Sequence, residues 1–116
     1  MGDLSAHFSR SEFRCHHCGA LPSRPVQRLL DGLEVVRQNH GGPVRIVSGY
    51  RCPVHNKRIG GATNSRHLAN AAADLEPGVL STRDAKIIGF VGIGDCRGWA
   101  VHVDIRPGPQ VVFPDC

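Results

Sequence analysis

The sequence is poor in aromatic residues and has no long hydrophobic run. Its aromatic side chains are four Phe, one Trp and one Tyr, or 5% of 116 residues, so a core must be built mainly from Leu, Val, Ile and Ala. No apolar stretch approaches the roughly 20 residues that a membrane-spanning helix needs. The first twenty residues also contain no apolar segment of the signal-peptide type. We therefore expect no membrane insertion and no export signal within this sequence.

Neither the basic nor the acidic residues are concentrated in one segment of the sequence. Lys and Arg number 14 against 10 Asp and Glu, and the arginines are spread from Arg10 to Arg106. Such a spread can favour an anionic partner, either a cell-wall polymer or a nucleic acid. No basic stripe alternates with aromatic residues, however, so we expect no nucleic-acid partner. The length and an apolar content of 41% are typical of one globular domain, and we expect a monomer.

Residues 25–40 carry the clearest helical pattern. Ser23 can cap this helix, Pro25 suits its first turn, and Gly41-Gly42-Pro43 stop it. Its apolar residues recur at spacings of three and four, which places one apolar stripe on the helix: Val26, Leu29, Leu30, Leu33 and Val36.

Three short segments have the pattern of strands: residues 44–50, 71–75 and 99–105. In the last of them, alternation predicts one face with Trp99, Val101, Val103 and Ile105, and another with Ala100, His102 and Asp104.

A second helix is expected over residues 85–91, after the capping sequence Ser81-Thr82-Arg83-Asp84. Residues 51–70 are polar and predict a long loop with one helical turn. Short strands mixed with helices, without a regular βαβ repeat, predict an α+β fold with a small, mostly antiparallel sheet and flanking helices.

His67, Asp74 and His102 form a candidate metal site. Catalytic zinc takes three protein ligands of these kinds and leaves a fourth position open. Two neutral imidazoles and one carboxylate leave the site with a net positive charge, which activates a water molecule and polarises a scissile carbonyl. Taken alone the three residues indicate little, because a histidine in a small domain is usually structural or exposed.

Longer motifs surround these residues. The segment SRHLANAAAD at residues 65–74 resembles the S-x-H-x-x-G-x-A-x-D signature of the zinc D-alanyl-D-alanine carboxypeptidases. Their superfamily includes vancomycin-resistance dipeptidases, phage endolysin peptidases and the hedgehog signalling domain. The segment WAVHVD at residues 99–104 resembles the closing H-x-D strand of one branch. The approach S-G-Y-R…N…G-G-A is matched by Ser48-Gly49-Tyr50-Arg51, Asn56 and Gly60-Gly61-Ala62.

The resemblance implies a hedgehog/DD-peptidase-like fold in one zinc peptidase domain, residues 1–116, with a Cys/His segment at 1–22 and a motif-bearing core at 44–106. It implies one catalytic Zn²⁺ on His67, Asp74 and His102, with peptidoglycan stem peptides as partners. The expected reaction is hydrolysis of a D-amino-acid-containing peptide bond, of carboxypeptidase or endopeptidase type. The expected site of action is the bacterial cell wall, as for a phage lysin. The alternative is a non-catalytic, metal-stabilised cell-wall-binding or interaction module of the same fold.

The resemblance also implies roles for two further residues. Arg51 is expected to face the substrate, where a guanidinium can hold a terminal carboxylate or stabilise a developing oxyanion. An ion pair on a turn is the alternative for this residue. Ser65 matches the motif serine, and its hydroxyl can bind substrate or orient the loop before His67.

Two positions depart from the family pattern. Asn70 stands where the motif has glycine, and Asn is the residue that best tolerates a left-handed backbone after glycine. Relatives also carry an acidic general base three residues before the last ligand, where this sequence has Trp99. Asp104 is the replacement candidate, either as the base or as a carboxylate that orients a ligand. Asp95 is a third possibility.

The five cysteines are an odd number, so disulfides cannot account for all of them. Cys15, Cys18, Cys52 and His55 have the C-x2-C…C-x2-H form of a structural zinc site, which makes a second ion possible. A disulfide to Cys52 and reduced thiols are the alternatives. Cys96 and Cys116 have no evident partners in the sequence.

Overall fold

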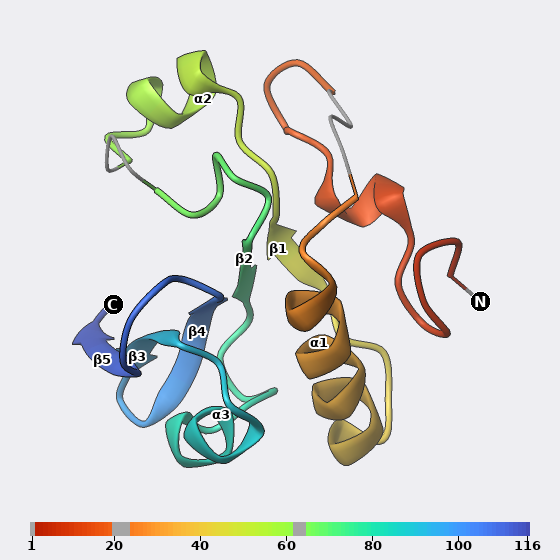
Figure 1. The fold of residues 1–116 in the computed structure, drawn as a ribbon, viewed down its shortest axis with the longest axis vertical. Coiled ribbons are helices and arrows are strands. Elements are labelled where there is room, and N and C mark those ends of the chain that lie inside the picture. Colours follow the sequence, from red (N-terminus) through yellow and green to blue (C-terminus); the bar gives the residue numbers. More distant parts are fainter. Residues whose placement is uncertain (1, 20–23, 62–64) are drawn as a thin grey trace.

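One five-stranded sheet organises the fold, with the strands in the order β1-β2-β4-β3-β5 (Figure 1). The computed structural model describes residues 2–19, 24–61 and 65–116, so the predicted cap Ser23 and the motif residue Ala62 lie outside the described residues. Neighbouring strands are antiparallel except β3 and β5, which are parallel. The predicted α+β fold with a mostly antiparallel sheet is therefore confirmed. The strands are β1 (Ile46–Ser48), β2 (Ala72–Leu75), β3 (Gly92–Cys96), β4 (Trp99–Asp104) and β5 (Val111–Pro114).

The long helix α1 (Gln27–His40) confirms the predicted apolar stripe. Leu29, Leu30, Leu33 and Val36 are buried along it. The helix begins two residues later than predicted, because Val26 has a non-helical backbone with ψ 131°. It ends where Gly41 takes a left-handed conformation with φ 75°, which glycine adopts without steric cost.

The helix α3 (Thr82–Ile88) begins and ends earlier than the predicted range of 85–91. Its N-terminus is capped by Ser81, whose Oγ accepts a hydrogen bond from the Asp84 backbone N–H at 3.0 Å. It stops at Gly89, which is left-handed with φ 102°. The chain then enters β3, a strand that the sequence analysis did not predict. β5 was also missed.

The predicted strands and loop helix are present with shifted ends. β1, β2 and β4 are each shorter than predicted, and the helical turn in the long loop is α2 (Pro53–Arg58). The predicted alternation along β4 is wrong at Ala100, which belongs to the buried core with Val103. A register shift between the pairs Gly94–His102 and Asp95–Ala100 accounts for this, since it inserts one extra residue in β4.

The N-terminal segment is part of the same core. Phe8 and Phe13 are both buried in this core, and Phe13 is the last residue of the 3-10 helix η1 (Arg10–Phe13). Glu34 on α1 fastens the segment by accepting hydrogen bonds from the Ser5 hydroxyl at 2.6 Å and the His7 backbone N–H at 2.8 Å. None of the helices that the structure describes has the length and apolar character needed to cross a membrane.

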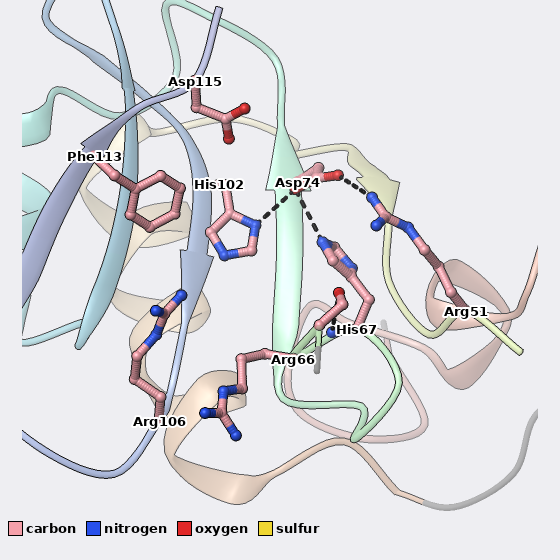
Figure 2. Close-up of a pocket in the computed structure, with 9 residues that line it drawn as sticks. Arg51, Arg66, His67, Asp74, His102, Arg106, Phe113 and Asp115 are labelled. Carbon is pink, nitrogen blue, oxygen red and sulfur yellow. Dashed lines mark hydrogen bonds and ion pairs between the residues drawn. The ribbon is translucent and has the colours of Figure 1, made fainter. Parts of the chain in front are cut away.

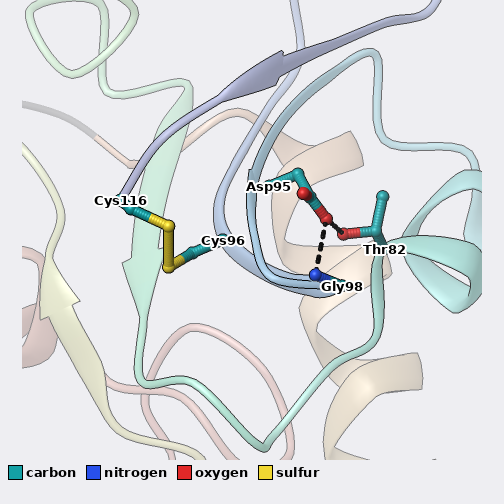
Figure 3. The surroundings of a disulfide bond; sticks show 5 residues. All are labelled: Thr82, Asp95, Cys96, Gly98 and Cys116. Carbon is teal, nitrogen blue, oxygen red and sulfur yellow. Dashed lines mark hydrogen bonds between the residues drawn. A yellow bond between two sulfur atoms is a disulfide. The ribbon is translucent and has the colours of Figure 1, made fainter.

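A disulfide joins Cys96 to Cys116, two cysteines for which the sequence showed no evident partners (Figure 3). Cys96 ends β3, and Cys116 follows β5, which lies beside β3 in parallel. The disulfide therefore fixes the C-terminal end of β5 to the C-terminal end of β3.

This crosslink should contribute measurably to stability. Closing a loop over a sequence separation of 20 residues is worth about 3 kcal/mol by the chain-entropy relation. We expect the double variant Cys96→Ser/Cys116→Ser to lose that amount of unfolding free energy in urea titrations without reductant. Wild type and variant should become equally stable in reductant. Equal stability without reductant would show that the bond does not constrain the unfolded chain.

Candidate metal centre

The sheet register brings the two strand residues of the predicted metal site together. Asp74 on β2 lies directly across from His102 on β4. His67 reaches the same point from the loop before β2, so that His67 Nε2 and His102 Nδ1 lie 3.2 and 3.0 Å from the same oxygen, Asp74 Oδ1 (Figure 2). One ligand atom from each of the three residues lies within 4.8 Å of the other two. This is a compact group of three donors of the kinds that zinc prefers.

The outer contacts of both imidazoles leave their inner nitrogens as donors to a metal. His67 Nδ1 lies 2.6 Å from the carbonyl oxygen of Gly49, which can only accept, so this nitrogen carries the proton. His102 Nε2 lies 2.7 Å from the Asp104 carboxylate, so it too donates outward. A histidine held in this way presents the lone pair of its other nitrogen, here toward Asp74. The residues present therefore fit a bound zinc ion.

The electrostatics of the group favour a positive charge. Burial alone would raise the pKa of Asp74, but hydrogen bonds from His102 and His67 hold it well below its usual range. Burial alone would lower the pKa of His102, but its bonds to Asp104 and Asp74 raise it to about 9. Without a metal, a proton on His102 Nδ1 supplies the positive charge beside Asp74. A bound metal ion would take the place of that proton.

Asp104 lies behind His102 and is fully buried. It accepts a hydrogen bond from Arg106 Nε at 2.8 Å as well as the one from His102. Burial opposes its ionisation, but Arg106 and His102 together lower its pKa to about 2. Gly92 on β3 makes room for it, since a Cβ there would meet the Asp104 carboxylate oxygens at 2.2 and 2.3 Å. These contacts suit a carboxylate that orients a ligand.

Asp95 lies in a different environment. Its carboxylate accepts hydrogen bonds from the Thr82 hydroxyl and, at 3.2 Å, from the Gly98 backbone N–H (Figure 3). It thereby joins the β3–β4 turn to the start of α3. The structure does not bring it to the candidate metal site.

A cavity of about 450 Å³ opens beside the three donors. Ser65 and Arg51 line it, as the resemblance implies, and so do four residues that the sequence analysis did not single out. The full lining consists of Arg51, Ser65, Arg66, His67, Asp74, His102, Arg106, Phe113 and Asp115.

Arg51 lies where the cavity meets Asp74, and its role toward the substrate stays a prediction. Its guanidinium lines the cavity, and its Nη2 pairs with Asp74 Oδ2 at 3.0 Å. Ser48 Oγ and Asn56 Oδ1 accept further hydrogen bonds from the same guanidinium, each at 3.4 Å. The S-G-Y-R…N motif therefore steadies the arginine against the Asp74 carboxylate.

The loop before β2 depends on local backbone geometry. Asn70 has φ 54°, so the predicted left-handed conformation at the motif glycine position is confirmed. Ser65 Oγ accepts a hydrogen bond from the His67 backbone N–H at 3.2 Å, which favours the loop-orienting role for this serine. The left-handed backbone of Asn70 and the hydrogen bond of Ser65 together orient His67 toward Asp74.

Asp115 is the cavity residue that the sequence analysis most clearly missed. Its exposed side chain comes from the end of β5 and lies over Gly94, where a Cβ would meet Asp115 Oδ2 at 2.4 Å and His102 Cβ at 2.9 Å. The alternating glycines Gly92 and Gly94 were an available signal, because they leave space on the face of β3 beside His102. The strand that delivers Asp115 had no comparable signal.

A second group of donors lies at the N-terminal side of the molecule. The thiol sulfurs of Cys15, Cys18 and Cys52 lie within 4.8 Å of one another. His55, the fourth residue predicted for this set, is not part of that group. Its ring instead stacks on His17, with centroids 5.9 Å apart.

Comparison with known proteins identifies one family. The family model described as Peptidase M15 matches residues 6–104, which include every residue of both donor groups. No curated protein matches the sequence.

The position of Asp104 generates a testable prediction. Asp104→Asn preserves the shape but removes the charge that holds His102, so zinc affinity should fall by about tenfold to a hundredfold, as for other residues that orient a metal ligand. Competition with a fluorescent chelator would measure it, with thermal unfolding as a check of folding. Asp95→Asn is the matched control and should bind zinc like wild type. Wild-type affinity in folded Asp104→Asn would contradict the orienting role.

Proposed function

The chain belongs to the Peptidase M15 family, and we propose that it is a zinc-dependent peptidase that hydrolyses D-amino-acid-containing peptide bonds of peptidoglycan. The observation that carries the proposal is the convergence of His67, Asp74 and His102 at one wall of an open cavity. Stem peptides are the proposed substrates, of carboxypeptidase or endopeptidase type, and the bacterial cell wall is the proposed site of action.

In this proposal His67 Nε2, an Asp74 carboxylate oxygen and His102 Nδ1 hold the zinc. The ion would supply Lewis-acid polarisation of the scissile carbonyl and a lowered pKa for the attacking water. Gly49 and Asp104 fix the two imidazole rings from behind, and Arg51 fixes the carboxylate from the side. The protein thus fixes all three donors in advance, which limits reorganisation during the reaction.

Arginines on the cavity wall support an anionic substrate. Arg51 and Arg106 are each paired with a carboxylate, Asp74 and Asp104 respectively. Arg66 also lines the cavity and forms no ion pair among the described residues. We therefore assign it the substrate carboxylate, which a guanidinium binds with two parallel hydrogen bonds. Arg51 remains able to stabilise the oxyanion that develops on the substrate beside Asp74.

Asp115 is our proposed general base. Hydrolysis needs a group that takes a proton from water and returns it to the leaving amine. Trp99 has no such group, Asp104 is buried in its pair with Arg106, and Asp95 lies outside the cavity. The exposed carboxylate of Asp115 lies beside His102 within the cavity. Asp115, which follows β5, would thus provide the acidic group that relatives carry at the position of Trp99 on β4.

Digestion of defined muropeptides tests the proposed reaction. Zinc-loaded protein should release products whose masses identify a cut at a D-amino-acid peptide bond. His67→Ala should lose both this activity and the zinc held at the centre, because two ligands cannot maintain a three-ligand geometry. Zinc binding without any cleavage would instead favour the non-catalytic binding module. The presence of Trp99 where relatives carry the acidic base also favours that alternative.

The role of Asp115 can be tested separately. Asp115→Asn should retain zinc but lower turnover by about two to four orders of magnitude, the range for loss of a general base. Its pH–rate profile should also lose the limb that reports deprotonation of the base. Asp31→Asn, at an exposed aspartate on α1, is the matched control and should have no effect. An unchanged rate and profile in Asp115→Asn would exclude Asp115 as the base.

A further inference from the structure

We propose that Cys15, Cys18 and Cys52, together with His55, bind a second zinc ion with a purely structural role. This site does not depend on the peptidase proposal. The three thiols belong to two chain segments, the turn after η1 and the residue that caps α2.

The sulfur atoms are already close to a metal-binding arrangement. They lie within 4.8 Å of one another. Thiolates bound to one tetrahedral zinc at about 2.3 Å are about 3.8 Å apart, so only a small contraction is needed. Cys15 is buried, Cys52 is half-buried and Cys18 is exposed, which leaves the group open to solvent on one side for entry of the ion.

Backbone groups stabilise negative charge on these sulfurs. The Cys52 N–H donates to Cys15 Sγ, and the His55 N–H donates to Cys52 Sγ, both at 3.4 Å. The turn is closed by a hydrogen bond from Gly19 N–H to the Cys15 carbonyl at 2.7 Å, with Gly19 left-handed at φ 71°. Such donors favour thiolates, the form that binds zinc.

The number of thiols argues against a disulfide as their resting state. The Cys96–Cys116 bond leaves the three thiols of Cys15, Cys18 and Cys52, and an internal disulfide could use only two of them. A zinc site with three sulfur donors and one nitrogen donor uses all of them.

His55 is the fourth donor by its position. It follows Cys52 by three residues in the first turn of α2, where residues three apart share one side of the helix. His16 is already engaged, with Nε2 lying 3.0 Å from the Val47 carbonyl oxygen.

The site would join the N-terminal segment to the loop that carries Arg51. Cys52 follows Arg51 directly, and the same two segments are joined by the hydrogen bond from Tyr50 N–H to the Phe13 carbonyl at 2.8 Å. Zinc would fix the arginine loop at Cys52, the residue next to Arg51. It would act on the position of Arg51 and not on the reacting atoms.

Metal counting separates this proposal from the peptidase proposal. Wild type should hold two zinc ions per chain, and Cys18→Ser and the double variant His67→Ala/Asp74→Ala should each hold one. Removing the disulfide with Cys96→Ser/Cys116→Ser is the matched control, and this variant should keep both ions. One ion in wild type, lost in His67→Ala/Asp74→Ala, would overturn the cysteine site. One ion that is lost only in Cys18→Ser would overturn the catalytic metal instead.

Cobalt substitution identifies the donors without reference to activity. Cobalt-loaded His67→Ala/Asp74→Ala should show the intense ultraviolet thiolate-to-cobalt charge-transfer band and the visible bands of a tetrahedral ion. His55→Ala should weaken the thiolate site, whereas His17→Ala should leave it unchanged. The reverse result would overturn His55 as the fourth donor, and absence of the charge-transfer band in the first variant would overturn the whole site.

Thiol counting under denaturing conditions completes the test and does not require a folded variant. Wild-type protein unfolded with a chelator and without reductant should present three alkylatable thiols. In the native zinc-loaded protein, those thiols should react slowly until the chelator is added. One alkylatable thiol after unfolding would show a second disulfide and overturn the proposal.

Discussion

The pairing of β2 with β4 places Asp74 across from His102, and the candidate site depends on that register. Successive residues in a strand point to opposite faces, so a slip of one residue would turn Asp74 into the core and Ala73 toward His102. The buried neighbours Ala73 and Val103 hold the register, because they form the pair on the core face. Packing on one side of the sheet thus fixes the chemistry on the other.

The Asp74 carboxylate is costly to bury, and its neighbours offset that cost. Two imidazole nitrogens reach one of its oxygens, and the Arg51 guanidinium reaches the other. Each of these groups is supported in turn, His67 by the Gly49 carbonyl and His102 by Asp104. Gly49 must be glycine for a separate reason, since a Cβ there would lie 2.7 Å from Phe13 Cα. The S-G-Y-R segment therefore serves packing and orientation together.

Local patterns in the sequence predicted the parts of the fold that local forces determine. The stripe on α1, the Ser81 cap and the left-handed Asn70 follow from side-chain spacing and backbone preference, and all three are present. The donors of the metal centre were found through their motif, while zinc binding itself stays a prediction.

Non-local contacts account for what the sequence did not reveal. β3 contains two glycines that weaken its strand pattern, and Asp104 and Asp115 occupy the space above them. β5 pairs in parallel with β3, and a parallel partner cannot be inferred from the local pattern. The Cys96–Cys116 pairing and the place of Asp115 in the cavity both depend on that strand.

The two outer strands of the sheet also bear on how the molecule behaves in concentrated solution. An edge strand with free backbone donors and acceptors is a template for pairing with another chain. Here β1 has three residues, and His16 covers its Val47 carbonyl. β5 has four residues, ends in Pro114 and is crosslinked at Cys116. Both edges are thus poor templates, which disfavours aggregation by sheet extension.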